Sequence, residues 1–120
     1  MNKKTLVIGA SPKPHRYSYR AVSSLRSHGH DVVALAKRKN KLMDVDIQTE
    51  FPHNEDIHTV TLYVGAPRQP EYYEPLLNLK PKRVIFNPGA ENPELYNKLE
   101  EEGIEAIEAC TLVMLTTNQY

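Results

Sequence analysis

The sequence predicts an α/β domain of three layers, in which helices cover both faces of a parallel sheet. Short runs of apolar residues alternate along the chain with segments of helical periodicity, as expected for successive strand–helix–strand units. Several of these runs are apolar at every position rather than at alternate positions, which is typical of strands buried on both faces. The length of 120 residues fits a single domain, residues 1–120, with a buried core.

Five of the apolar runs have the length and composition of buried strands. We expect these strands to be parallel and, numbered along the chain, to lie in the order 3-2-1-4-5 across the sheet. Residues 37–56 have the weakest pattern, in which a further short strand near 45–48 and a turn near 52–54 fit best. The five expected strands are residues 5–8, 31–36, 58–64, 83–86 and 104–109.

The first expected helix spans residues 18–28 and follows the first strand. Ser18 is a suitable N-cap, because its hydroxyl can accept a hydrogen bond from an unpaired N–H of the first turn. Gly29 stands where a left-handed residue often ends a helix. Near the other end of the sequence, residues 111–117 are expected to form a short terminal helix, although an apolar run of this length is also compatible with a strand.

The two remaining helices precede the fourth and fifth strands. Residues 69–79 have helical periodicity, but Pro75 lacks an N–H group and predicts either a kink or a late helix start. The next helix has the strongest local signals in the chain. Asn92 is a good N-cap, Pro93 takes the first helical position, and Gly103 marks the end.

Charge and composition exclude several classes of partner. Lys and Arg together number 15, as do Asp and Glu, so the net charge is zero, whereas nucleic-acid-binding domains usually carry a basic excess or a basic face. No stretch approaches the roughly 20 apolar residues of a membrane span. The apolar start of the chain breaks at residues 9–12, which is too soon for a signal peptide. We therefore expect a cytoplasmic protein that binds neither nucleic acid nor membranes.

Metal and disulfide chemistry are also not expected. The single cysteine, Cys110, excludes an intramolecular disulfide and a multi-cysteine metal site. The five histidines have no spacing typical of a zinc site. We expect Cys110 to be a small core residue, where a serine hydroxyl would lack a partner and reduce stability. A thiol close to a bound ligand is the alternative.

Three loops rich in Gly and Pro follow the first, third and fourth strands. In open α/β sheets, ligands bind beyond the carboxyl ends of the strands, at the point where the strand order reverses. Glycine lets backbone N–H groups approach a phosphate closely, so these loops favour a nucleotide site, although strand ends also need turns for structural reasons. The three loops are Gly9-Ala10-Ser11-Pro12, Gly65-Ala66-Pro67 and Asn87-Pro88-Gly89.

The end of the second strand distinguishes between classes of nucleotide. The first loop departs from the dinucleotide fingerprint G-x-G-x-x-G, because Ser11 and Pro14 replace its second and third glycines. The acidic residue that holds the ribose hydroxyls of NAD is also absent, and Lys37 and Arg38 follow the strand instead. A basic residue there suits the phosphorylated ribose of NADP or coenzyme A, unless both side chains are simply solvated in an exposed loop.

The segment between the first strand and the first helix carries groups for the rest of a nucleotide. Lys13 and Arg16 can neutralise a diphosphate, and arginine can do so with two parallel hydrogen bonds. Ser18 would direct the N-terminus of the helix toward the anion, and Tyr17 can lie against an adenine ring. Each residue alone is also common in an exposed loop, so their concentration in this one loop is what favours a site.

Several motifs of the chain occur together in one known family. They are Gly9-Ala10-Ser11-Pro12, Arg16-Tyr17-Ser18-Tyr19-Arg20, Gly29-His30-Asp31-Val32-Val33, Val84-Ile85-Phe86-Asn87-Pro88-Gly89-Ala90, and Gly103-Ile104 leading to Cys110. With these motifs the chain resembles the small stand-alone CoA-binding domain proteins, which are similar to the CoA-binding domain of the succinyl-CoA synthetase α subunit. Only residues 38–56 lie outside the resemblance. The departures are Ala34-Leu35-Ala36-Lys37, where the family usually has a Pro-Val-Asn-Pro-like segment, and Asn87, where it usually has glutamine.

The resemblance implies a Rossmann-like fold with coenzyme A as the ligand. We therefore expect a small non-catalytic module that binds coenzyme A or an acyl-CoA. No constellation of catalytic residues is recognisable, and the five-stranded unit leaves no room for a substrate domain. The alternatives are an NADP-dependent enzyme and a non-catalytic subunit of a larger CoA-using enzyme, and the sequence identifies no particular protein partner.

Overall fold

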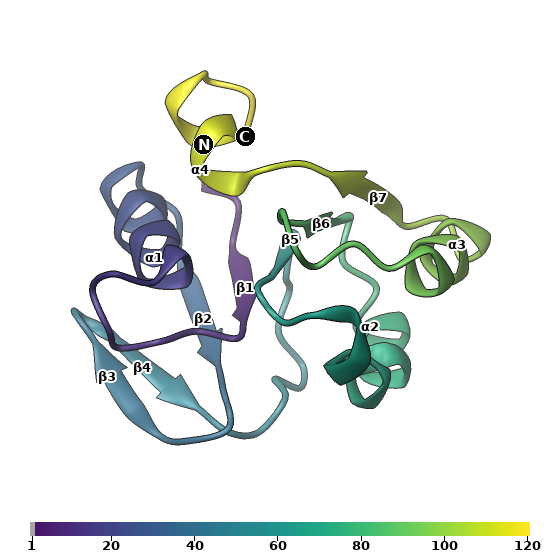
Figure 1. The fold of residues 1–120 in the computed structure, drawn as a ribbon, viewed down its shortest axis with the longest axis horizontal. Helices are drawn as coiled ribbons and strands as arrows, with labels where there is room; N and C mark the ends of the chain where they lie inside the picture. The colour runs from purple at the N-terminus through teal and green to yellow at the C-terminus, as the bar shows by residue number, and fades with distance from the viewer. Residues whose placement is uncertain (1) are drawn as a thin grey trace.

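Seven strands form one sheet that is parallel except at one edge (Figure 1). The computed structural model describes residues 2–120. Across the sheet the strands lie in the order β3-β4-β2-β1-β5-β6-β7, and only β3 is antiparallel to its neighbour. The strands are β1 (Thr5–Ile8), β2 (Val32–Leu35), β3 (Asn40–Leu42), β4 (Val45–Gln48), β5 (Thr59–Leu62), β6 (Arg83–Phe86) and β7 (Glu105–Glu108).

The expected α/β class with a mostly parallel sheet is confirmed, but the strand order is wrong. The third expected strand was placed beside the second, whereas β5 pairs with β1, with Thr59 opposite Thr5. The reason is that the neighbouring edge of β2 is already occupied by β4, since Ala34 lies opposite Ile47. A tight hairpin, with Met43 in the left-handed region at φ 56°, adds β3 outside β4. The crossover to β5 therefore returns to the opposite side of β1.

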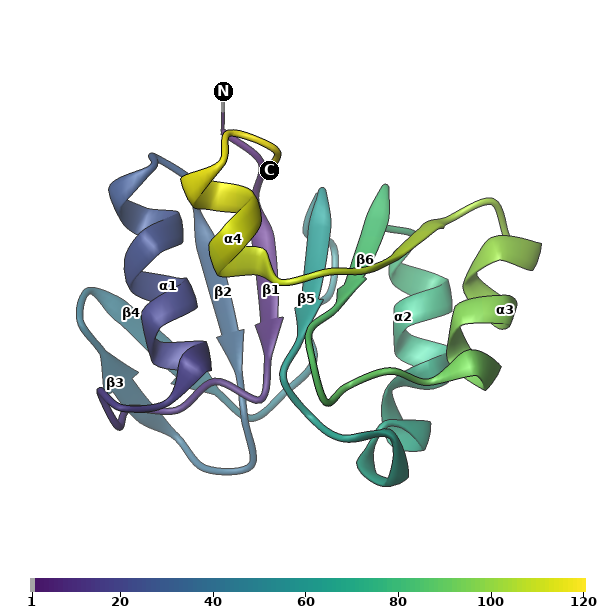
Figure 2. The same ribbon diagram turned by 45° about the horizontal axis from the view of Figure 1, so that its top comes forward.

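Helices cover both faces of the sheet, as predicted. Figure 2 shows α1 and α4 side by side on one face, with α2 and α3 on the other. Buried apolar side chains form two clusters, one between the sheet and α2 and α3, the other between the sheet and α1 and α4. No helix within residues 2–120 is long and apolar enough to span a bilayer. The helices are α1 (Tyr17–Ser27), α2 (Tyr73–Leu79), α3 (Pro93–Glu101) and α4 (Thr111–Thr116), with 3-10 turns η1 (Ala66–Arg68) and η2 (Pro70–Tyr72).

Most of the expected helix ends are confirmed. The side chain of Asn92 accepts hydrogen bonds from the N–H groups of Glu94 and Leu95 at 3.1 and 3.3 Å. Gly29 ends α1 in the left-handed region at φ 83°. The helix expected over residues 69–79 starts late, because α2 begins only at Tyr73. Pro75 then falls in the first turn, where its missing N–H is not needed.

The N-cap assignment of Ser18 is wrong. Helix α1 begins at Tyr17, so Arg16 is at the N-cap position and Ser18 lies buried within the first turn. The N–H of Arg16 bonds to the carbonyl of Lys13 at 3.0 Å, and this turn brings the chain into the helix earlier than expected. Within residues 2–120, no side chain accepts a capping hydrogen bond at the start of α1, so its N-terminal N–H groups are left for another acceptor.

Candidate functional site

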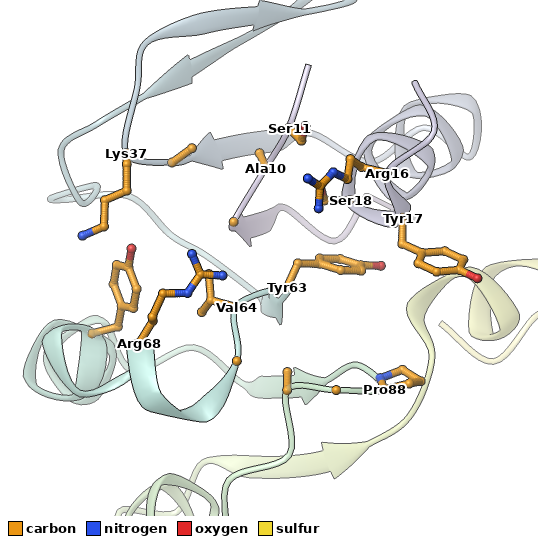
Figure 3. A pocket seen from close by; sticks show the side chains of 16 residues that line it. Ala10, Ser11, Arg16, Tyr17, Ser18, Lys37, Tyr63, Val64, Arg68 and Pro88 are labelled. Carbon is orange, nitrogen blue, oxygen red and sulfur yellow. The ribbon is translucent and has the colours of Figure 1, made fainter. Parts of the chain in front are cut away.

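A cavity of about 390 Å³ opens at the carboxyl ends of β1, β2, β5 and β6 (Figure 3). It lies where the strand order reverses, because the chain leaves β1 toward α1 on one face and leaves β5 toward α2 on the other. This is the position at which open α/β sheets bind their ligands. The lining residues are Gly9, Ala10, Ser11, Arg16, Tyr17, Ser18, Ala36, Lys37, Tyr63, Val64, Gly65, Arg68, Tyr72, Pro88, Gly89 and Ala90.

The structure brings most of the predicted site residues together around this cavity. Those that line it are Gly9, Ala10, Ser11, Arg16, Tyr17, Ser18, Lys37, Gly65, Pro88 and Gly89. Four predicted residues do not line it. Lys13 is exposed in the turn before α1, and Ala66 and Pro67 form the start of η1 beside the cavity. Asn87 is buried beneath the loop that follows β6.

Six lining residues were not predicted. Tyr63 and Val64 directly follow β5, so the same strand end that drew attention to Gly65 could have identified them. Arg68 and Tyr72 belong to η1 and η2, which fold back over the cavity in place of the expected continuous helix. The other two residues, Ala36 and Ala90, carry only a methyl group, and nothing in the sequence singles them out.

Three cationic side chains from separate elements point toward the cavity. Figure 3 shows Lys37 and Arg68 on one side and Arg16, at the start of α1, on the other. No carboxylate is among the lining residues. Within residues 2–120, no three His, Cys, Asp or Glu side chains lie close enough to hold a metal ion. The arrangement therefore favours an anion with several separate negative groups.

Among the residues that the structure describes, Lys37 is the one cation of the three that forms an ion pair with a carboxylate. Its Nζ lies 2.6 Å from both carboxylate oxygens of Glu71, which stands just outside the cavity on η2. The hydrogen bond to Glu71 raises the pKa of Lys37, so the ammonium form is secure at neutral pH. The Nζ also lies 5.9 Å from the ring centre of Tyr72. Both partners of the ion pair are largely exposed, so the pair adds little to stability.

Two of the lining glycines differ in what a side chain at their position would contact. Gly9 has φ 90°, and a Cβ there would come within 2.9 Å of the carbonyl oxygen of Tyr63 and of Cγ1 of Val64. Its lack of a side chain is therefore required by the contact between the β1 and β5 loops. Gly65 has φ −69°, and a Cβ there would meet nothing closer than 3.8 Å. Of these two glycines, Gly65 is therefore the one beside space that the protein itself does not fill.

A comparison with known protein families identifies the chain. The profile of the CoA-binding domain family matches residues 3–116, which include all the lining residues. The chain belongs to this family. The match also includes residues 38–56, the segment in which the sequence motifs gave no resemblance.

Solved structures contain the same fold as this CoA-binding domain. The crystal structure of an uncharacterized protein is 46% identical, with a TM-score of 0.97, and the alignment covers 100% of this chain and 99% of that one. A hypothetical protein from Pyrococcus horikoshii OT3 is 25% identical, with a TM-score of 0.87 and coverages of 97% and 83%. The dinucleotide-forming acetyl-coenzyme A synthetase 1 of Ca. Korarchaeum cryptofilum, solved with phosphate and ADP, is 15% identical. Its TM-score is 0.71, and the alignment covers 90% of this chain and 26% of that one. No curated protein matches the chain.

Asn87 holds the loop after β6 of the CoA-binding domain in place. Its Nδ2 donates to the hydroxyl of Thr61 at 2.6 Å and to the carbonyl of Leu62 at 2.9 Å. Its Oδ1 accepts from the N–H of Thr111 at 2.9 Å. Asn87 thus joins β5, β6 and α4, and it supports Pro88 and Gly89 from below.

Tyr63 lines the cavity, whereas Cys110, at the start of α4, does not. The ring of Tyr63 lines the cavity, while its hydroxyl is buried and has no hydrogen-bond partner within residues 2–120. Burial raises the pKa of Tyr63, so the phenol stays protonated. Cys110 is the N-cap residue of α4 and is only half-buried. The expectation of a buried core cysteine is therefore wrong, because the chain leaves the sheet at this residue.

Proposed function

We propose that this chain binds coenzyme A or an acyl-CoA in the cavity described above and catalyses no reaction of its own. The observation that carries the proposal is the set Arg16, Lys37 and Arg68, three cations around a cavity without a lining carboxylate. Coenzyme A has phosphoryl groups at two places, a diphosphate and a ribose phosphate. Cations on two sides of one cavity match that separation, and membership of the CoA-binding domain family supports this choice of ligand.

The diphosphate is assigned to the loop between β1 and α1. Arg16 stands at the N-terminus of α1, where N–H groups without a side-chain cap attract an anion. Gly65 and Gly89 border the same space and let backbone approach a phosphate closely. Lys37 and Arg68 on the other side are then assigned to the ribose phosphate. The tyrosine rings of the lining offer flat surfaces for the adenine or the pantetheine chain.

The absence of catalysis is proposed from the chemistry of the lining. The side chains that face the cavity are cationic, phenolic, hydroxylic or apolar, and none is a carboxylate, an imidazole or a thiol. Such a set provides no group that exchanges a proton readily near neutral pH. A role as a non-catalytic subunit of a larger enzyme is the second candidate. It is favoured by the fold match to about a quarter of the acetyl-coenzyme A synthetase chain.

Ligand-dependent thermal unfolding tests the choice of nucleotide. A ligand that binds only the folded state at a hundredfold excess over Kd stabilises it by about 2.7 kcal/mol, which raises Tm by several degrees for a domain of this size. We expect CoA to raise Tm most, NADP less and NAD least. An equal effect of NAD and CoA would contradict the proposal, as would turnover of NADPH by the isolated chain.

Calorimetry on a matched pair of arginine variants locates the site. Arg16→Ala should weaken CoA binding by roughly 1–3 kcal/mol, the range for a lost charge-assisted hydrogen bond. Arg20→Ala is the control. Arg20 lies in the first turns of α1, with its guanidinium 5.6 Å from the ring centre of Tyr17, and it does not line the cavity. Equal losses in both variants would indicate a general effect of charge and would remove Arg16 from the site.

A further inference from the structure

The ammonium group of Lys37 already forms an ion pair before any ligand binds. Glu71 holds the ammonium group with both carboxylate oxygens at 2.6 Å. The other two cations of the lining, Arg16 and Arg68, have no carboxylate partner within residues 2–120. Lys37 is thus the one cation of the site for which a bound anion has to compete.

We propose that Glu71 is a specificity-determining residue that weakens the preference of the cavity for a phosphorylated ribose. The inference rests on the proposed function, in which Lys37 meets the ribose phosphate. A phosphate that reaches Lys37 must either displace the Glu71 carboxylate or bind beside it. Displacement loses the ion pair, and binding beside it brings two negative groups close together. Both routes reduce the gain from the phosphate and leave a ligand without that phosphate unaffected.

Exposure of the pair sets the size of the effect. The side chains of Lys37 and Glu71 are 66% and 50% exposed, and exposed pairs contribute little because water screens them. The competition therefore tunes the choice between nucleotides and does not block either of them. We expect a change of roughly two- to fivefold in relative affinity when the carboxylate is removed.

Glu71 also supplies a group that the second strand lacks. Dinucleotide sites that take an unphosphorylated ribose place a carboxylate at the end of that strand, and here Lys37 follows β2 instead. The carboxylate of Glu71 comes from η2, far along the chain, and yet lies within hydrogen-bond distance of Lys37. The position thus combines a cation and an anion, which suits a site that accepts ribose both with and without a phosphate.

Affinities for CoA and dephospho-CoA test the inference, because the two ligands differ only in the ribose phosphate. Glu71→Gln should tighten CoA binding by roughly two- to fivefold and leave dephospho-CoA binding unchanged. Lys37→Gln should weaken CoA binding toward the value for dephospho-CoA. In the Lys37→Gln background, Glu71→Gln should no longer tighten CoA binding, because the cation for which Glu71 and the phosphate compete is absent.

Glu74→Gln is the matched control. It removes the same charge from a neighbouring exposed position that makes no ion pair within residues 2–120. Equal changes for both ligands in Glu71→Gln, or the same selective change in Glu74→Gln, would overturn the inference while leaving the proposed function intact. If the unmodified chain bound neither ligand, the proposed function itself would fail, and the role of Glu71 with it.

Discussion

Arginine side chains are buried at one end of the sheet and exposed at the other. At the amino ends of the strands, Arg83 is 8% exposed, donates from Nε to the hydroxyl of Thr59 at 2.7 Å, and lies 4.4 Å from the ring centre of Tyr120. The hydroxyl of Tyr120 in turn hydrogen-bonds to that of Thr5. At the carboxyl ends, Arg16 and Arg68 are exposed and face an open cavity.

The contrast indicates which end binds a ligand. The cluster at the amino ends is covered by the chain itself, and within residues 2–120 Nη2 of Arg83 is buried without a hydrogen-bond partner. The cavity at the carboxyl ends has cations, uncapped N–H groups and unfilled space beside Gly65. Polar groups that the protein positions and does not use are the ones available to another molecule.

The largest effects are expected from substitution of two glycines, one of which should change stability and the other ligand affinity. Gly9→Ala should reduce the free energy of unfolding by about 2–4 kcal/mol, because it combines a left-handed backbone with a contact of 2.9 Å. Gly65→Ala should leave stability unchanged or raise it by up to about 1 kcal/mol, and should weaken CoA binding. Denaturant unfolding and calorimetry on both variants measure the two effects.

Two outcomes would contradict this distinction between the two glycines. If Gly9→Ala were as stable as the unmodified chain, the β1 and β5 loops would not be in the tight contact described. If Gly65→Ala bound CoA with unchanged affinity, the space beside Gly65 would not belong to the site.

A smaller effect is expected at the amino ends of the strands, from the titration of His30. Burial, and then nearby positive charges, lower the pKa of His30 from its ordinary value of 6.5. The unfolded chain then binds more protons than the folded one, so stability is full above about pH 6.5 and falls as the pH drops toward the lowered pKa. Protonation also removes the acceptor at Nδ1 for the N–H of Lys3, at 2.9 Å.

His30→Asn should reduce this pH dependence, because the amide oxygen can accept the same hydrogen bond and does not titrate. Thermal unfolding between pH 5 and 8 measures the slope. His53→Asn is the control, since His53 is exposed. An unchanged slope in His30→Asn would show that His30 is not the group responsible for the pH dependence.

The smallest effect is expected for Cys110→Ser. The sequence predicts a loss of stability, but the structure reverses the sign, because Cys110 is the N-cap of α4 and makes no capping hydrogen bond. A serine hydroxyl there can accept from the N–H groups of the first turn and should add about 0.5–1 kcal/mol. CoA affinity should stay within a few-fold, as Cys110 does not line the cavity. A loss of binding without a loss of stability would instead place the thiol in the site.

The parts of the fold that were predicted correctly depend on local chemistry. The signals at Asn92, Pro93 and Gly103 act within a single turn of the chain, and α3 has the expected start and end. The strand order depends on which edge is already filled. The short strand expected near 45–48 is present as β4, but β3 and the pairing of β4 with β2 were not foreseen, because no local signal indicates them.

The site was predicted as far as strand ends could identify it. The glycine loops and Arg16 were found because a parallel sheet brings its carboxyl ends together at one edge. Arg68 was missed because it reaches the cavity only through η1, and Glu71 was missed because it reaches Lys37 only through η2; these two 3-10 turns replace the start of the expected helix. Asn87 was correctly singled out by its position, but its polar atoms are all directed into the protein.

The outermost strands have a consequence for how the chain behaves at high concentration. β3 has only three residues, of which Asn40 and Lys41 are exposed, and β7 carries exposed Glu105 and Glu108. Short, charged edge strands are poor templates for pairing with strands of another molecule. With a net charge of zero, the chain lacks long-range repulsion between its copies. Resistance to aggregation then depends on the charges of these two strands. Neutral residues in place of Lys41 and Glu105 would therefore favour pairing of the edge strands between molecules.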